Sequence, residues 1–188
     1  EPILDETFRE YHTIEISEHI CTIASERYKN FEKYGLDITH DVMHSDVYDK
    51  EWDSDSSRGY YFDNRLQLYN GDSSHTLRKV LASIKERCCF WLDAHSGAQK
   101  YARGKVDVPL FEELWAIGEH HIKNHIIAID DAHLFGKIQK NKTGHVICDY
   151  SEVTLEKVTE KIKEINPKYD VGIYAPYEMP MLIAYVIK

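Results

Sequence analysis

Two short segments of the chain each carry acidic residues directly after a run of apolar residues. They are FWLDAHSG at residues 90–97 and IIAIDD at residues 126–131. Apolar runs of this length are typical of strands buried in a parallel sheet, and the ligands of open α/β sheets bind beyond the carboxyl ends of such strands. We therefore expect Asp93, Asp130 and Asp131 to meet at one edge of one sheet. Carboxylate oxygens favour a hard divalent cation such as Mg²⁺, Mn²⁺ or Ca²⁺.

Histidines lie close to both acidic segments and offer a group that can exchange a proton. His95 follows Asp93 by two residues and is the favoured general base, because imidazole titrates near neutral pH. His133 is a weaker substitute. The structural alternatives stay open at this point: His95 could be a polar loop residue, and the aspartates could be helix caps or loop carboxylates.

Composition and charge indicate a folded domain that does not bind nucleic acid or membranes. The chain has 188 residues, of which 43% are hydrophobic and 12% aromatic, so a single domain over residues 1–188 is expected. A net charge of -9 argues against general attraction to nucleic acid or to anionic membrane surfaces. No apolar stretch approaches the roughly 18–20 residues of a membrane span, and the chain does not begin with a signal-peptide pattern.

The cysteines and the histidine-rich segment do not indicate zinc. The four cysteines are Cys21, Cys88, Cys89 and Cys148, and they form no CxxC pair. They are interpreted as reduced thiols of a cytoplasmic protein. His120, His121 and His125 sit at an expected helix end without a cysteine or another spaced ligand, so we interpret them as a solvated helix terminus.

Strands and helices alternate along most of the chain. Expected strands cover residues 11–17, 66–73, 88–95 and 125–131, and expected helices cover residues 2–10, follow Ser17, contain Leu77 to Ile84, begin at Pro109 and span 152–165. This order predicts an α/β fold with a Rossmann-like, doubly wound and mostly parallel sheet. The segments YDVGIYA and MPMLIAYVIK predict a C-terminal antiparallel hairpin. Phe90, Trp91 and Trp115 are expected in the core.

Three segments fall outside this alternation. Residues 36–64 are rich in Asp and Ser and are interpreted as a solvated insertion or, alternatively, as an ordered flap over the site. Residues 96–108 and 134–150 follow the acidic strands and are expected to be substrate-contacting loops.

Four motifs in this order resemble the class I S-adenosylmethionine-dependent methyltransferases. They are TIEIS at 13–17, LYNGDS at 68–73, FWLDAH at 90–95 and AIDDAHLFG at 128–136. They are most similar to metal-dependent, macrocin-type O-methyltransferases, including those that act on the sugar hydroxyls of macrolides. The resemblance implies that Glu15 holds the cofactor ribose, that Asp72 and Ser73 lie by the adenine, that Asp93 contributes to the cofactor site and to catalysis, and that Asp93, Asp130 and Asp131 bind a divalent cation, with Mg²⁺ expected.

The sequence departs from this family at its beginning. The first strand and the glycine-rich turn that should precede the helix at residues 2–10 are not found. The strands on either side of that first strand are then expected to lack their central partner. We interpret the chain as clipped at its N-terminus, or else as a divergent protein that no longer binds this cofactor.

The resulting hypothesis is methyl transfer to a hydroxyl of a small polyhydroxylated substrate, sugar-like or catechol-like. A divalent cation would polarise the hydroxyl, and His95 would accept its proton. Two alternatives remain: a metal-dependent hydrolase that uses the same carboxylates, and a non-catalytic Rossmann-like binding module. Homo-oligomerisation is left open.

Overall fold

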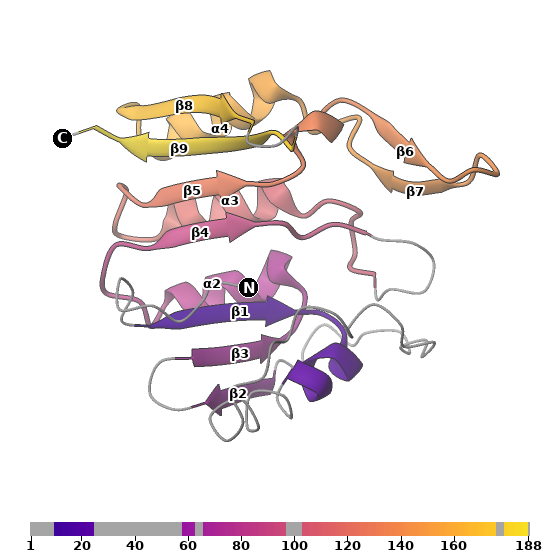
Figure 1. Cartoon of the computed structure of the whole chain (residues 1–188). Coiled ribbons are helices and arrows are strands. Elements are labelled where there is room, and N and C mark those ends of the chain that lie inside the picture. The colour runs from indigo at the N-terminus through magenta and orange to yellow at the C-terminus, as the bar shows by residue number, and fades with distance from the viewer. Residues whose placement is uncertain (1–9, 25–57, 63–65, 97–102, 176–178, 188) are drawn as a thin grey trace.

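The computed structural model describes residues 10–24, 58–62, 66–96, 103–175 and 179–187 (Figure 1). The elements are β1 (Tyr11–Glu15), β2 (Arg58–Phe62), β3 (Leu66–Asn70), α2 (Ser73–Leu81), β4 (Cys89–Leu92), α3 (Leu110–Glu119), β5 (Ile126–Ile129), a 3-10 turn (Ala132–Leu134), β6 (Ile138–Lys140), β7 (Val146–Asp149), α4 (Leu155–Ile165), β8 (Tyr169–Tyr174) and β9 (Met181–Val186). A further helix begins after Ser17 and is described over residues 18–24. None of the described helices is long and apolar enough to cross a membrane.

The described strands form three sheets. In the first, β1 pairs in parallel with β3, and β2 pairs with β3 in the antiparallel direction; the second has the order β4-β5-β9-β8, and the third is the β6-β7 ribbon. The pair β4 and β5 is parallel, whereas β9 is antiparallel to both β5 and β8. The alternation of elements and the C-terminal hairpin are confirmed. The single, doubly wound sheet is not found among the described strands.

β1 and β4 are the facing edge strands of the two larger sheets. Figure 1 shows these strands as neighbours in the stack, with the arrows of β1, β3, β4 and β5 pointing the same way. Within the described ranges β1 pairs with β3 alone and β4 pairs with β5 alone, so no backbone ladder joins the two sheets.

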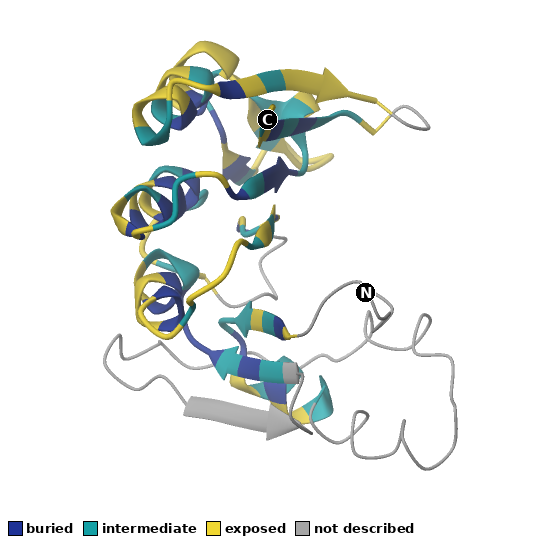
Figure 2. Cartoon of the chain, turned by 90° about the vertical axis from the view of Figure 1, so that its left-hand side faces the viewer, coloured by how far each residue is buried: buried dark blue, intermediate teal, exposed yellow. Residues whose placement is uncertain are grey.

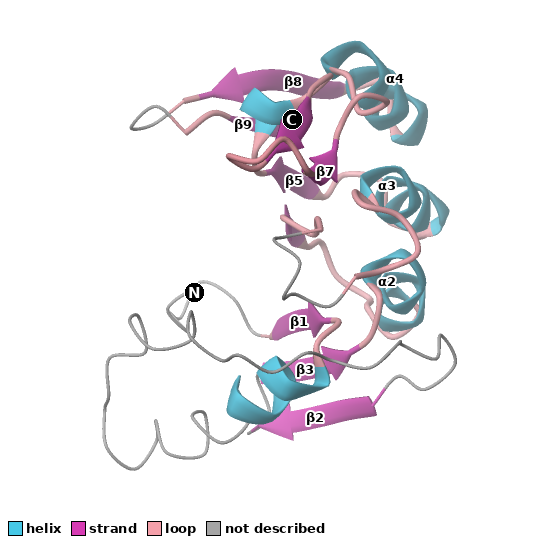
Figure 3. Cartoon of the chain, turned by 90° about the vertical axis from the view of Figure 1, so that its right-hand side faces the viewer, coloured by secondary structure: helices cyan, strands magenta, loops and turns pink. Residues whose placement is uncertain are grey.

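The core lies between the strands and three helices. Figure 3 shows α2, α3 and α4 on the same side of the strands, and Figure 2 shows their buried residues on the helix faces turned toward the strands. On α4, Val158 and Ile162 are four residues apart and both fully buried, as expected for one face of a helix. On α3, Leu114 and Ile117 are likewise fully buried. Each such side chain contributes roughly 1.5–3 kcal/mol through removal from water.

Two of the three expected core aromatics are exposed instead. Trp91 is 57% exposed, because side chains alternate along β4 and those of Phe90 and Leu92 take the helix-facing side. Trp115 is 48% exposed on the outer face of α3, where the Arg78 guanidinium lies 4.0 Å from its ring centre as a cation–π contact. Phe90 alone packs against the core, partly buried.

The segments expected to be irregular contain two pieces of sheet. Residues 58–62 of the expected insertion form β2, and the rest of that insertion lies outside the described residues. The expected loop at 134–150 contains the β6-β7 ribbon, whose Ile138 and Val146 are both exposed. Short strands with exposed apolar and charged residues lack the burial pattern that identifies strands in a sequence. The helix expected at residues 2–10 lies outside the described part of the chain.

Two of the three histidines expected at a solvated helix end, His120 and His125, are buried and form a hydrogen-bond chain. His120 Nε2 lies 3.0 Å from the carbonyl oxygen of Ile84, so it donates, and Nδ1 is the acceptor of the neutral ring. His125 Nε2 donates to that atom at 2.9 Å, and His125 Nδ1 accepts the Cys88 N–H at 3.0 Å. Every ring nitrogen of the pair is therefore used when both rings are neutral. The earlier interpretation as a solvated terminus is wrong for these two residues.

Burial and the neighbouring His120 lower the pKa of His125 from 6.5 to about 4. A lowered pKa means that the unfolded chain takes up a proton first as the pH falls. The stability contribution of the neutral His125 is therefore complete above about pH 6.5 and is lost as the pH falls toward 4.

We expect His125→Phe to lower the free energy of unfolding by about 1–3 kcal/mol at pH 7.5, because the Cys88 N–H and His120 Nδ1 lose their partner in a buried site. The measurement is urea unfolding, with His145→Gln on the exposed β6-β7 turn as the matched control. Between pH 6.5 and 4, the stability of the variant should also fall less than that of the wild type. Equal stability of His125→Phe and the wild type at both pH values would contradict this account.

Candidate functional site

The parallel pairing of β4 with β5 brings the two acidic segments to one edge of the sheet. Leu92 lies opposite Ile129 in the register, so the residues that follow each strand leave the sheet side by side. One ligand atom each from Asp93, His95 and Asp131 lies within 4.8 Å of the other two. Two of the three aspartates named from the sequence are therefore close together, and a histidine joins them.

The three side chains form a small, partly exposed cluster. His95 Nε2 lies 3.3 Å from Asp131 Oδ2 and 3.8 Å from Asp93 Oδ1. The Asp131 side chain is 20% exposed and that of Asp93 is 47% exposed, so the cluster is open to solvent on the Asp93 side. His133 lies on the other side of Asp131, with Nδ1 3.7 Å from Oδ1. Carboxylate and imidazole groups at this spacing can share one cation.

Asp131 takes an unusual backbone conformation that directs it toward the cluster. Its φ of 53° and ψ of 28° lie in the left-handed region, which Asp and Asn adopt more readily than other side chains. The Asp131 N–H donates to Asp130 Oδ1 at 2.8 Å. Asp130 thus supports the turn and is not a member of the three-residue cluster, and its role as a metal ligand stays a prediction.

Charge accumulates at this end of β4. Burial raises the pKa of the Asp93 carboxyl above its usual range, the carboxylates of Asp130 and Asp131 raise it further, and His95 acts in the opposite direction. Like charges disfavour ionisation of one another, whereas a cation between them favours it. A bound cation would therefore lower the electrostatic energy of the site.

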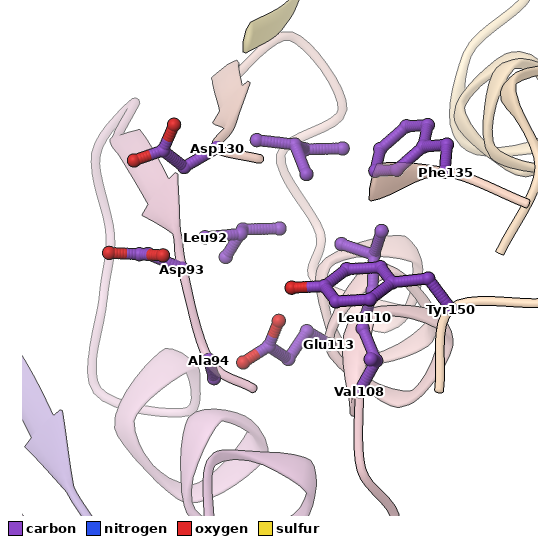
Figure 4. A pocket seen from close by; sticks show the side chains of 10 residues that line it. Leu92, Asp93, Ala94, Val108, Leu110, Glu113, Asp130, Phe135 and Tyr150 are labelled. Carbon is purple, nitrogen blue, oxygen red and sulfur yellow. The ribbon is translucent and has the colours of Figure 1, made fainter. Parts of the chain in front are cut away.

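A small pocket lies beside the cluster, on the helix side of β4. Its volume is about 10 Å³, about enough for one water molecule. Figure 4 shows the Glu113 carboxyl and the Tyr150 hydroxyl directed into it, whereas the carboxylates of Asp93 and Asp130 point away. Apolar side chains complete the lining, among them Leu92, Val108, Leu110, Ile129 and Phe135. Burial also raises the pKa of Tyr150, so its hydroxyl stays protonated at neutral pH.

Glu113 is a buried acid that sequence reasoning missed. It is 3% exposed, and its carboxyl pKa rises from 4.5 to about 7 because of burial first, with Asp72, Glu112 and Asp93 adding to the rise and a hydrogen bond with Ser73 opposing it. The available signal was its spacing: Glu113 is three residues from Leu110 and four from Ile117, on the apolar face of an amphipathic helix.

The residues expected to contact the cofactor adenine have structural partners in the chain. Asp72 caps α2, with Oδ1 accepting the Ser74 N–H at 2.9 Å, and Oδ2 accepts the Lys105 N–H at 3.3 Å. A Cβ on Gly104 would lie 2.6 Å from Oδ2, so the loop packs directly on this carboxylate. Asp72 is 7% exposed. Asp72 is therefore the N-cap of α2, while its contact with a cofactor stays a prediction.

Glu15 lies where the sequence placed it, at the last residue of β1. Its Oε1 accepts the Ser17 N–H at 2.8 Å, and its carbonyl oxygen accepts the Gly71 N–H that follows β3. Because β1 and β3 are parallel, Glu15 and Asp72 leave the same edge of their sheet. Their assignment to one cofactor is consistent with this placement.

Comparisons with known proteins give little further information. No protein-family model matches the chain, and no curated protein matches it. Among solved structures, the chain is similar to that of the SAH-bound methyltransferase PaMTH1 from Podospora anserina, with 17% sequence identity and a TM-score of 0.49. The similarity covers 95% of this chain and 61% of that one.

We expect Glu113→Gln to change the pH dependence of stability. A raised pKa means that the folded protein holds the proton more tightly, so this contribution is complete below pH 4.5 and is lost as the pH rises through 7. A pKa difference of this size corresponds to about 3 kcal/mol. Urea unfolding between pH 4.5 and 8 should show wild-type stability falling relative to Glu113→Gln. Glu160→Gln, an exposed acid on α4, is the control, and parallel pH profiles for the wild type and Glu113→Gln would contradict the burial argument.

Proposed function

We propose that the chain belongs to an S-adenosylmethionine-dependent O-methyltransferase that acts, with the help of a divalent cation, on a hydroxyl of a small sugar-like or catechol-like substrate. The observation that carries the proposal is the meeting of Asp93, His95 and Asp131 beyond the carboxyl ends of β4 and β5. The order of the four motifs along the chain favours methyl transfer over other metal-assisted reactions.

The donor set suits a divalent cation. Two carboxylates and one imidazole can each supply a ligand atom within 4.8 Å of the others. A divalent ion held there would polarise a substrate hydroxyl and lower its pKa. Such ions take about six ligands, so three protein donors leave positions for two neighbouring substrate oxygens. This is why a diol or a catechol is the proposed acceptor.

The sheet that contains β1 and β3 provides the proposed cofactor residues. Glu15 at the end of β1 can accept hydrogen bonds from two vicinal hydroxyls, as a ribose presents. Ser73 begins α2 and lies next to Asp72, whose carboxylate holds the turn after β3. S-adenosylmethionine, when bound, would supply the methyl group. The role of these residues is to hold and orient the cofactor at the shared strand edge.

Two histidines are available at the site for proton transfer. His95 is the expected general base, and His133 is half exposed beside Asp131. A base must come within hydrogen-bond reach of the substrate hydroxyl. His133 is accessible from the solvent side, whereas His95 Nε2 faces the two carboxylates.

We expect the protein to bind S-adenosylhomocysteine in isothermal titration calorimetry, and Glu15→Gln to weaken binding roughly 10- to 100-fold, the value of charge-assisted hydrogen bonds. Glu18→Gln, an acid three residues further on in the helix at 18–24, is the matched control. Asp72→Asn keeps the acceptor for the helix cap but removes the charge, so it separates a structural role from cofactor binding.

Two results would contradict the proposal. Binding unaffected by Glu15→Gln would remove the proposed ribose contact. No binding of S-adenosylhomocysteine by a protein that still binds a divalent metal would favour the metal-dependent hydrolase instead.

A further inference from the structure

His95 is held in one tautomer by the backbone. Its Nδ1 lies 3.0 Å from the carbonyl oxygen of Ser96. A carbonyl oxygen can only accept, so Nδ1 carries the hydrogen and donates it. In the neutral ring, Nε2 then has a free lone pair, and this atom is the one that faces Asp131 Oδ2 and Asp93 Oδ1.

Three potential ligand atoms, His95 Nε2 and one oxygen each of Asp93 and Asp131, therefore lie within 4.8 Å of one another. Metal-binding histidines commonly show this arrangement, with one ring nitrogen donating to a backbone carbonyl and the other free to coordinate. The hydrogen bond to Ser96 lies outside the cluster and is independent of its charge.

Hydrogen bonds to the loop before α3 hold the segment that carries His95. The Ser96 N–H donates to the Asp107 carbonyl oxygen at 2.6 Å, and Ser96 Oγ donates to Asp107 Oδ1 at 2.8 Å. Ser96 is 4% exposed, so these bonds are shielded from water. The carbonyl that orients His95 is thus tied to the loop before α3. An orientation fixed in this way reduces the entropy lost when a metal binds.

We propose that His95 is a metal ligand of this site, and that the site therefore prefers first-row transition ions such as Fe²⁺, Co²⁺ or Zn²⁺ to Mg²⁺. The inference deepens the proposed function, on which it rests, by naming the class of metal. Imidazole suits Fe, Ni, Cu and Zn, whereas Mg²⁺ selects oxygen ligands and gives up its water reluctantly. A site of three aspartates would have the opposite preference. The general-base role then passes from His95 to His133.

The test compares Co²⁺ with Mg²⁺ by calorimetry and follows the visible absorption of Co²⁺, which responds to nitrogen ligation and needs no cofactor or substrate. The wild type should bind Co²⁺ more tightly than Mg²⁺. His95→Ala should lose at least about 10- to 100-fold in Co²⁺ affinity, because that is the loss typical when only an outer-shell partner of a metal ligand is removed. His95→Asp, which replaces the nitrogen with oxygen donors, should lose the preference for Co²⁺ and change the absorption spectrum.

Matched variants separate this site from adventitious binding. Asp131→Asn keeps a residue suited to the left-handed turn but removes a carboxylate ligand, so Co²⁺ affinity should fall. His145→Ala, on the exposed β6-β7 turn, should leave it unchanged. Circular dichroism confirms that each variant is folded.

Three outcomes would overturn the inference: Mg²⁺ binding at least as tightly as Co²⁺, Co²⁺ affinity unaffected by His95→Ala, or no binding of either ion, which would leave His95 as an ion-pair partner of the carboxylates. Each of these metal-binding measurements is made without S-adenosylhomocysteine. A failure of the metal assignment is therefore distinguishable from a failure of cofactor binding.

Discussion

The parallel pairing of β4 with β5 is the constraint on which the site depends. It fixes Leu92 opposite Ile129 and so brings the residues after both strands to the same place. Two carboxylates held close together repel each other. The fold maintains the cluster of Asp93 and Asp131 in spite of this cost, and the imidazole of His95 offsets only part of it. A cation is the simplest way to compensate the remainder.

The surrounding structure keeps the cluster in position from two directions. On the β5 side, Asp130 accepts the N–H of Asp131 and supports its left-handed turn. On the β4 side, Ser96 and the loop before α3 orient His95. Beneath the site, α3 packs Leu114 and Ile117 into the core and carries Glu113 to the neighbouring pocket. The sheet of β1 and β3 presents Glu15 and the α2 cap at its own parallel edge, without a backbone ladder to β4 among the described residues.

Local patterns predicted the strands and helices well, because apolar runs and helix periodicity report burial directly. The ends of β4 and β5 were predicted for this reason, and the clustering of their acids followed from general sheet geometry. The tautomer of His95 and the backbone of Asp131 could not be predicted, because each depends on contacts made only in three dimensions. Trp91 was misplaced because burial on both faces of β4 was assumed. The β6-β7 ribbon was missed because its residues are exposed, and the role of Asp72 as the N-cap of α2 was not predicted.

Anomalous diffraction from crystals of the protein grown with Mn²⁺ or Co²⁺ tests the central claim most directly, because it locates the ion itself. We expect one strong peak among Asp93, His95 and Asp131, at about 2.0–2.6 Å from a ligand atom of each. A peak elsewhere, or an ion bound to Asp93, Asp130 and Asp131 with His95 turned away, would contradict the mixed nitrogen and oxygen site. No peak among these residues at saturating metal would show that the cluster is an ion pair and not a metal centre.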